Sequence, residues 1–161
     1  MVNFVGSKQP APRVTSNNAA FFSSLRDGCF KLQRCPRCGE VIYYPRVVCP
    51  HCLYTGKLEW VPVSGLGTIY SFAIVHRPQH PSFFKDVPII LVAIRLDEGP
   101  TMISSMVGCS PEDVRIGMRV AVTTYPSTDI LIPRFVPYSG RATVGVPRAV
   151  TSGQEEPSSH D

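Results

Sequence analysis

The sequence predicts a mainly β protein, in which a short N-terminal helix and a cysteine-rich ribbon precede a small five-stranded barrel. Three observations support this fold class: a short segment with helical spacing of apolar residues, four of the six cysteines in two C-x-x-C pairs, and a series of short β-type runs after them. With 161 residues and 43% apolar content, the chain is long enough to bury a core.

The helix is expected within residues 17–28, NNAAFFSSLRDG. Asparagine is a good helix N-cap, and glycine at position 28 can end a helix. Between them the apolar side chains recur on one face, at Phe21, Phe22 and Leu25. The preceding residues show no periodic pattern, so we expect an N-terminal arm and helix over residues 1–28.

The cysteine-rich segment follows at residues 29–57 and contains CPRCGEVIYYPRVVCPHC. Two C-x-x-C pairs in a chain without a recognisable signal peptide favour a metal site over disulfides. Four thiolates around one ion leave no open position for water or substrate, so the site is expected to be structural. We favour Zn²⁺ over iron, although rubredoxin-like iron uses the same geometry. The predicted ligands are Cys35, Cys38, Cys49 and Cys52.

The remaining cysteines, the histidine between the ligands and the nearby cations are not expected to bind the metal. His51 lies between two ligands and is expected to be solvated or to support the site from outside it. Cys29 and Cys109 are expected to be buried small apolar residues. A zinc ion with four thiolates carries a charge of −2, which nearby cations can offset. These cations are Lys31, Arg34, Arg37 and Arg46.

Six β-type runs then extend to residue 137, and the barrel is expected over residues 58–137. The runs are LEWVPV, GTIYSFAIVH, PIILVAIRL, TMISSMV, MRVAVTTY and ILIPRFV. Trp60, in the first run, is expected to wedge the ribbon against the barrel. CSPEDVRIGM predicts one short helical turn, with Ser110 as N-cap, at a place compatible with an OB-fold. Apolar alternation predicts core positions at Tyr70, Phe72, Ile74, Ile90, Val92 and Ile94.

Composition restricts the environment and the partners. Residues 138–161 are polar and rich in Gly, Pro and Ser, which predicts a mobile tail. The longest apolar run, around residues 87–94, is too short to span a bilayer, so a cytoplasmic protein without membrane contact is expected. The net charge of +4 does not by itself indicate nucleic acid. A single-stranded nucleic-acid-binding OB-fold module remains the alternative function, because such folds bind strands through basic grooves and aromatic platforms.

The order of these segments, with CPRCGEVIYYPRVVCPHC, then GLGTIYS, EDVRIGM and a closing PRFVP, resembles a known family over about residues 17–137. This is the family of OB-fold proteins with an N-terminal rubredoxin-like zinc ribbon, long called domain of unknown function thirty-five. The resemblance implies a non-catalytic accessory subunit of a thiolase-superfamily enzyme that makes or breaks a carbon–carbon bond in an acyl-CoA. Thiolase, aldolase and hydroxymethylglutaryl-CoA synthase partners all occur in the family, in hetero-oligomers such as a heterotetramer.

A coenzyme A ester would then be the substrate of the complex, and its arm needs an apolar groove and a few cations. The first inter-strand loop of an OB-fold commonly lines the binding face. Here that loop is HRPQHPSFFKDVP, residues 76–88. We expect acyl-CoA or partner contacts from Arg77, His80, Phe83, Phe84 and Lys85. The alternative is that the two phenylalanines close one end of the barrel while the charges face water.

Overall fold

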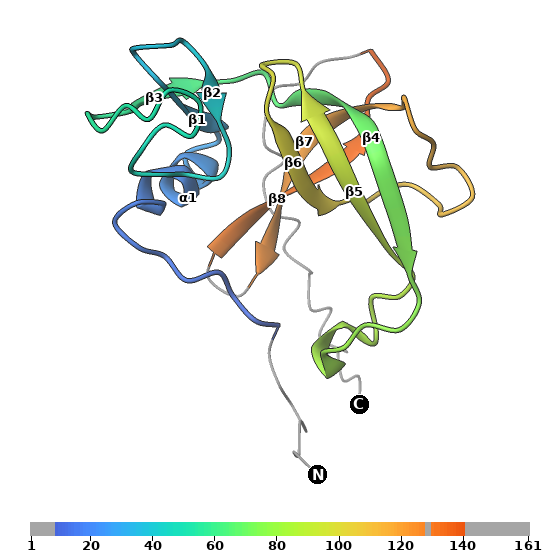
Figure 1. Cartoon of the computed structure of the whole chain (residues 1–161). Helices are drawn as coiled ribbons and strands as arrows, with labels where there is room; N and C mark the ends of the chain where they lie inside the picture. The colour runs from blue at the N-terminus through green and yellow to red at the C-terminus, as the bar shows by residue number, and fades with distance from the viewer. Residues whose placement is uncertain (1–8, 128–129, 141–161) are drawn as a thin grey trace, which may run out of the picture.

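The computed structural model describes residues 9–127 and 130–140. One α-helix, one 3-10 helix and eight strands lie within these ranges (Figure 1). Their bounds are α1 Ala19–Arg26, β1 Lys31–Arg34, β2 Val41–Ile42, β3 Glu59–Pro62, β4 Leu66–Val75, η1 Pro81–Phe83, β5 Ile89–Leu96, β6 Thr101–Ser105, β7 Arg119–Ser127 and β8 Ile130–Pro137. The tail predicted at 138–161 falls outside the described residues from position 141 onward.

Helix α1 begins directly after Asn18 and ends before Gly28, as its sequence predicts, but the expected side-chain cap is missing. The backbone N–H of Gly28 donates to the carbonyl of Leu25, and the N–H of Cys29 donates to that of Ser24. With Gly28 at φ +74°, these bonds form a Schellman motif. At the other end, the Asn18 side chain does not cap the helix. Its Oδ1 instead accepts from the N–H of Thr15 at 2.7 Å, which corrects the predicted capping role.

The ribbon forms a three-stranded antiparallel sheet in the order β2-β1-β3. Strand β3 comes from the first of the six β-type runs, and it pairs with β1 from Lys31↔Pro62 to Arg34↔Glu59. This run therefore belongs to the sheet of the ribbon and not to the barrel. Trp60, on β3, packs against the core that α1 and the barrel share, as expected of a wedge between the two parts.

The other five strands form an antiparallel sheet in the order β6-β5-β4-β7-β8. Its two edges meet at one point, where Met106 forms a parallel bridge with Phe135 and the N–H of Val107 donates to the Phe135 carbonyl at 2.8 Å. The result is a nearly closed five-stranded barrel, which confirms the predicted fold class. Phe21, Phe22 and Leu25 of α1 join the core of this barrel.

Two glycines allow strand β4 to start so close to its neighbours. Gly65 has φ +70°, and a Cβ there would lie 2.2 Å from Cγ1 of Val122. A Cβ at Gly67 would lie 2.7 Å from the backbone carbonyl oxygen of Arg95 on β5. The G-x-G in GLGTIYS is therefore required by strand packing.

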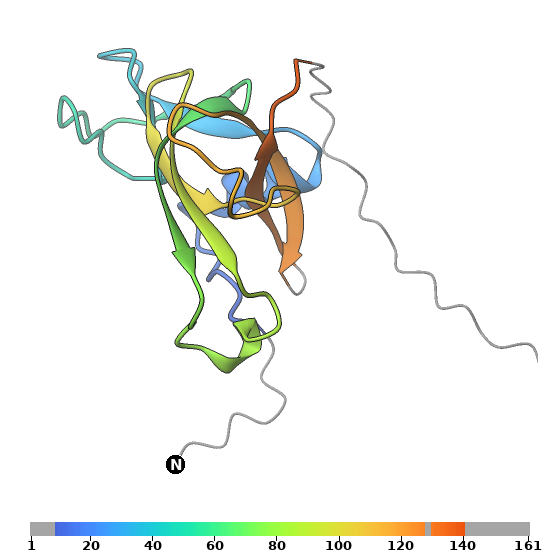
Figure 2. The same ribbon diagram turned by 90° about the vertical axis from the view of Figure 1, so that its right-hand side faces the viewer.

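Strand β4 contains a β-bulge that moves two predicted core residues to the surface. Pairing with β5 shifts between Ile69 and Ser71, and Tyr70 is the extra residue. Beyond Thr68 the pairing of β4 with β7 ends, and β4 continues with β5 alone as an arm that extends past the barrel (Figure 2). Tyr70 is 62% exposed and Phe72 37%, so their assignment to the core was wrong. Ile90, Val92 and Ile94 of β5 are buried as predicted.

The segment between β6 and β7 is a hydrogen-bonded turn and not a helical turn. The N–H of Asp113 donates to the carbonyl of Ser110 at 3.0 Å, and no helix is assigned between residues 107 and 118. The proline and the acidic residue after Ser110 also suit a type I turn, which needs fewer residues than a helix. No described helix is long and apolar enough to cross a membrane.

Candidate functional site: the cysteine cluster and an apolar cavity

The four cysteines of the C-x-x-C pairs meet at one place. Their sulfur atoms all lie within 4.8 Å of one another, with 3.6 Å between Cys35 and Cys52 and 3.7 Å between Cys38 and Cys49. Sulfurs at 2.3 Å from a tetrahedral Zn²⁺ are about 3.8 Å apart, so this donor set fits zinc. Burial, complete for Cys35 and Cys49, favours closed coordination without a water position.

Two similar loops hold the cysteine pairs. In the first, the N–H of Gly39 donates to the carbonyl of Cys35, and in the second the N–H of Leu53 donates to that of Cys49. The residue after each second cysteine is left-handed, with φ +79° at Gly39 and +58° at Leu53. Each C-x-x-C pair therefore folds as a tight turn that directs both thiols inward.

The neighbouring histidine and the remaining cysteines lie outside this cluster. His51 is exposed, in agreement with a solvated role. Cys29 is exposed, which corrects its predicted burial, because it follows the helix-ending Gly28 on the surface. Cys109 is partly buried, and its Sγ donates to the carbonyl of Ser110. Burial and then the charge of Asp113 raise the pKa of the Cys109 thiol, so it is a poor nucleophile.

The loop at residues 76–88 lies at the far end of the arm, where β4 ends and β5 begins (Figure 1). Arg77, Phe84 and Lys85 are exposed, whereas His80 and Phe83 are partly buried. The Nδ1 of His80 accepts from the N–H of Ser82 and caps the 3-10 helix η1. Phe84 is 57% exposed, so it does not close the barrel.

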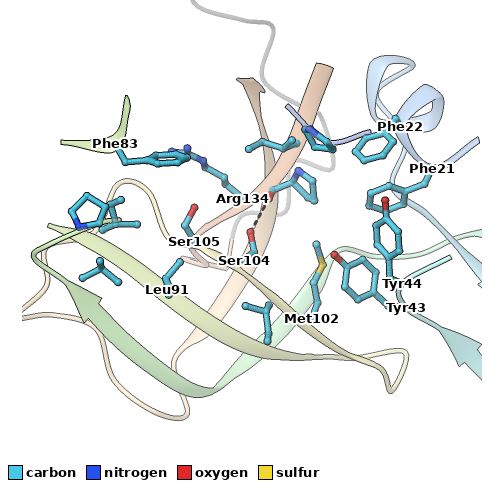
Figure 3. A pocket seen from close by; sticks show the side chains of 17 residues that line it. Phe21, Phe22, Tyr43, Tyr44, Phe83, Leu91, Met102, Ser104, Ser105 and Arg134 are labelled. Carbon is cyan, nitrogen blue, oxygen red and sulfur yellow. Dashed lines mark hydrogen bonds between the residues drawn. The ribbon is translucent and has the colours of Figure 1, made fainter. Parts of the chain in front are cut away.

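An open apolar cavity of about 520 Å³ lies between this arm, α1, the ribbon and the barrel (Figure 3). Phe83 of the loop lines one side, and aromatic residues of α1 and of the ribbon line another. Its size is within the usual range of small-molecule sites. The principal lining residues are Phe21, Phe22, Tyr43, Tyr44, Leu91, Met102, Ile103, Ser104, Ser105 and Arg134.

Sequence reasoning missed this cavity because its residues come from separate segments with no local motif. One signal was present: Arg134 interrupts the otherwise apolar run ILIPRFV of β8. A charged residue in the middle of a barrel strand indicates either an exposed position or a specific partner. Its guanidinium lies 3.8 Å from the centre of the Tyr125 ring. Phe83 is the only residue of the predicted contact set that lines this cavity.

A four-thiol ribbon that packs against the core of a small barrel defines the class of zinc ribbon proteins with an OB-fold domain. The sequence matches two family models that adjoin each other. The first is the ChsH2 rubredoxin-like zinc ribbon domain, over residues 22–59, and the second is the ChsH2 C-terminal OB-fold domain, over residues 60–124. The chain therefore belongs to the ChsH2-type family of zinc ribbon and OB-fold proteins, also called DUF35.

Known proteins similar to this chain carry several names. A "Probable enoyl-CoA hydratase alpha subunit" from Thermomonospora curvata is 30% identical over 132 residues, which are 80% of this chain and 40% of that protein. A "DUF35 domain-containing scaffold protein" from Methanocaldococcus jannaschii is 38% identical over 54% of this chain and 61% of its own length. The solved structure "Ltp2-ChsH2(DUF35) aldolase" matches with a TM-score of 0.70 and 29% identity, over 79% of this chain and 98% of that one. The chain thus spans less than two thirds of the two sequence relatives.

Proposed function

We propose that this chain is a non-catalytic, zinc-binding accessory subunit of a thiolase-like enzyme complex that acts on carbon–carbon bonds of an acyl-CoA. The observation that carries the proposal is the match to almost the whole length of a chain in a structure called an aldolase. The hydratase alpha subunit among the relatives supports the same acyl-CoA context. Within this proposal the chain shapes or completes the acyl-CoA site and stabilises the partner.

The zinc ion has a structural role in this proposal and is held by Cys35, Cys38, Cys49 and Cys52. Four thiolates and one Zn²⁺ complete the coordination, so the ion supplies no activated water. What it does supply is the folding energy of a ribbon whose sheet has only three short strands.

The loop at residues 76–88, which we call the arm loop, is our candidate for contact with the acyl-CoA or the enzyme subunit. The contacts would come from Arg77, His80, Phe83, Phe84 and Lys85. Its exposed cations suit the phosphates of coenzyme A. Its exposed phenylalanine suits an apolar pocket on a partner, because buried aromatic anchors dominate many interfaces.

Co-expression with a thiolase-like enzyme from the genome that encodes this chain tests the proposal. We expect both chains to elute together in size-exclusion chromatography and to remain together in moderate salt. Two proteins that elute separately, each monodisperse, would count against an accessory subunit.

One observation favours a second candidate, a single-stranded nucleic-acid-binding module. The bulge in β4 exposes Tyr70 and Phe72 on the barrel, and the guanidinium of Arg95 lies 5.3 Å from the centre of the Tyr70 ring. Exposed aromatic rings beside an arginine are the usual stacking platform for unpaired bases. Salt-dependent binding of a single-stranded oligonucleotide, weakened by Tyr70→Ala, is the result that this candidate requires.

A further inference from the structure

The cavity in Figure 3 lies where the barrel is not closed. Strand β6 pairs with β5 and strand β8 pairs with β7, and the backbones of the two edges are bridged at Met106 and Phe135. Further along, the Ser104 hydroxyl donates to the carbonyl of Pro133 at 2.7 Å and spans the gap. Beyond that bond the space between the strands opens into the cavity.

The walls of the cavity suit a hydrocarbon body. Most of the lining side chains are apolar or aromatic. They include Phe22 of α1, Tyr43 of the ribbon, Met102 and Ile103 of β6 and Leu91 of β5. Leu91 is 40% exposed and Ile103 is 73% exposed, so the cavity leaves apolar area in contact with water. Covering that area is favourable by about 25 cal/mol per Å².

The cavity has one cationic residue in its wall. Arg134 extends from β8 across the cavity toward Phe83 (Figure 3). The Tyr125 ring supports its guanidinium at 3.8 Å, and its Nε is buried without a hydrogen-bond acceptor among the described residues. Burial lowers the pKa of Arg134, although the nearby Tyr125 and Asp86 act in the opposite direction.

The acidic group whose charge acts on Arg134 is Asp86, which forms its hydrogen bond with another residue. Asp86 shares the adjoining hollow with Arg134, and its Oδ2 accepts from the Nε2 of Gln9 at 2.5 Å. No ion pair joins Asp86 to Arg134 in the described part of the chain, where the two salt bridges are Arg34–Glu59 and Arg119–Asp97. A partly desolvated arginine with a free donor at the edge of an apolar cavity has the chemistry of a carboxylate receptor.

We infer that this cavity binds an amphipathic carboxylate, with the hydrocarbon body against Leu91 and Ile103 and the carboxylate on the guanidinium of Arg134. The arginine supplies charge and direction, and the walls supply apolar contact. This site belongs to the chain itself and does not depend on an enzyme partner, so its failure leaves the proposed accessory function untouched.

The test uses calorimetric titration of the full chain with two probes of the same shape. Decanoate carries the carboxylate, and decanamide is its neutral counterpart. We expect decanoate to bind at least about tenfold more tightly than decanamide, because only the carboxylate carries a negative charge and two acceptor oxygens that can pair with the guanidinium. Equal affinities, or no heat with either probe, would overturn the inference.

Two matched variants assign the preference to one residue. Arg134→Met should reduce decanoate affinity by about tenfold or more and leave decanamide binding unchanged. Arg95→Met removes a second arginine that lies over a tyrosine ring, Tyr70, but outside the cavity, and should bind both probes as the parent chain does. An unchanged preference for decanoate in Arg134→Met contradicts the inference. If that variant fails to fold, the comparison of the two probes on the unaltered chain still decides.

Discussion

The Nδ2 of Asn18 donates a hydrogen bond of 2.7 Å to the hydroxyl of Tyr44, which joins the residue before α1 to the ribbon. The same amide donates to the carbonyl of Arg13 at 3.1 Å, and Asn18 is only 5% exposed. The ring of Tyr44 also lies edge-on to Phe21 of the helix. The helix, the segment that precedes it and the ribbon are therefore held together by one buried polar group.

Asn18→Ala should lower the free energy of unfolding by about 1–3 kcal/mol, because it removes three hydrogen bonds and leaves buried groups without partners. Tyr44→Phe removes one of them and should cost about 1 kcal/mol. Urea denaturation measures both. The exposed neighbour provides the control, and Asn17→Ala should change stability by less than about 0.5 kcal/mol. Equal effects of the Asn17 and Asn18 variants would contradict the role of the bond.

Cys38→Ser should remove the bound metal and unfold the ribbon, since three thiolates and a hydroxyl bind zinc far more weakly than four thiolates. Zinc content by atomic absorption and the far-ultraviolet circular dichroism spectrum report the two effects. Cys29→Ser, at an exposed cysteine outside the cluster, is the matched control and should retain full metal content. Normal zinc content in Cys38→Ser would refute the assigned ligand set.

Leu53→Gly should stabilise the protein. Leu53 has φ +58° and is 73% exposed, so its side chain contributes little packing while its backbone is left-handed. Glycine adopts this conformation without a steric penalty, as Gly39 does at the equivalent position of the first loop. The substitution should therefore raise the free energy of unfolding by about 1 kcal/mol. Val47→Gly, at another exposed position of the ribbon, should instead be neutral or destabilising. A lower melting temperature for Leu53→Gly than for the parent chain would show that this conformation is not costly.

Asp97→Asn should weaken the dependence of stability on acid pH. The two carboxylate oxygens of Asp97 accept from Arg119 at 2.7 Å each, and this hydrogen bonding lowers the pKa of the carboxyl group. Its stabilising contribution is thus complete above the unfolded pKa of about 3.9 and is lost as the pH falls through the lower pKa of the folded state. Both side chains are 42% exposed, so the effect at neutral pH should be only about 0.5–1 kcal/mol.

Thermal unfolding from neutral to acid pH checks this expectation. Glu112→Gln, at an exposed carboxylate without a described ion pair, should reproduce the parent curve. The assignment fails if Asp97→Asn loses stability toward low pH as steeply as the parent chain.

Phe84→Ala should weaken binding to the enzyme subunit with little effect on folding. Phe84 is 57% exposed on the arm loop, so its removal leaves no cavity in this chain. At an interface the same change commonly costs more than about 1 kcal/mol of binding free energy. Ile116→Ala, at a 68% exposed residue of the turn before β7, is the control. Indistinguishable dissociation constants for the two variants would exclude the arm loop from the contact.

Local sequence patterns predicted most of the fold. The cysteine spacing predicted the cluster, and Gly28 predicted the helix end, because each depends on a few adjacent residues. The exposure of Tyr70 and Phe72 could not be predicted, since it follows from a bulge and from the end of pairing between β4 and β7. Asn18 was recognised as a polar residue at a helix start, but its partner Tyr44 is 26 positions away.

The same limit applies to the candidate sites. The four thiols lie within one short segment, whereas the cavity around Arg134 is lined by the loop at residues 76–88, the helix, the ribbon and strands β4, β5, β6 and β8. The domain boundaries at 28, 57 and 137 remain predictions, and the pairing of β3 with β1 shows that the ribbon's sheet extends past residue 57.

The central claim is that the chain serves another enzyme and does no chemistry alone. The most direct measurement is the rate of acyl-CoA carbon–carbon bond cleavage or formation by the thiolase-like enzyme that co-purifies with this chain, assayed alone, with this chain and with the Cys38→Ser variant. We predict that the chain raises the rate at least about tenfold, which corresponds to roughly 1.4 kcal/mol of transition-state stabilisation, and that the variant does not. An enzyme that is equally active in all three assays would contradict the account.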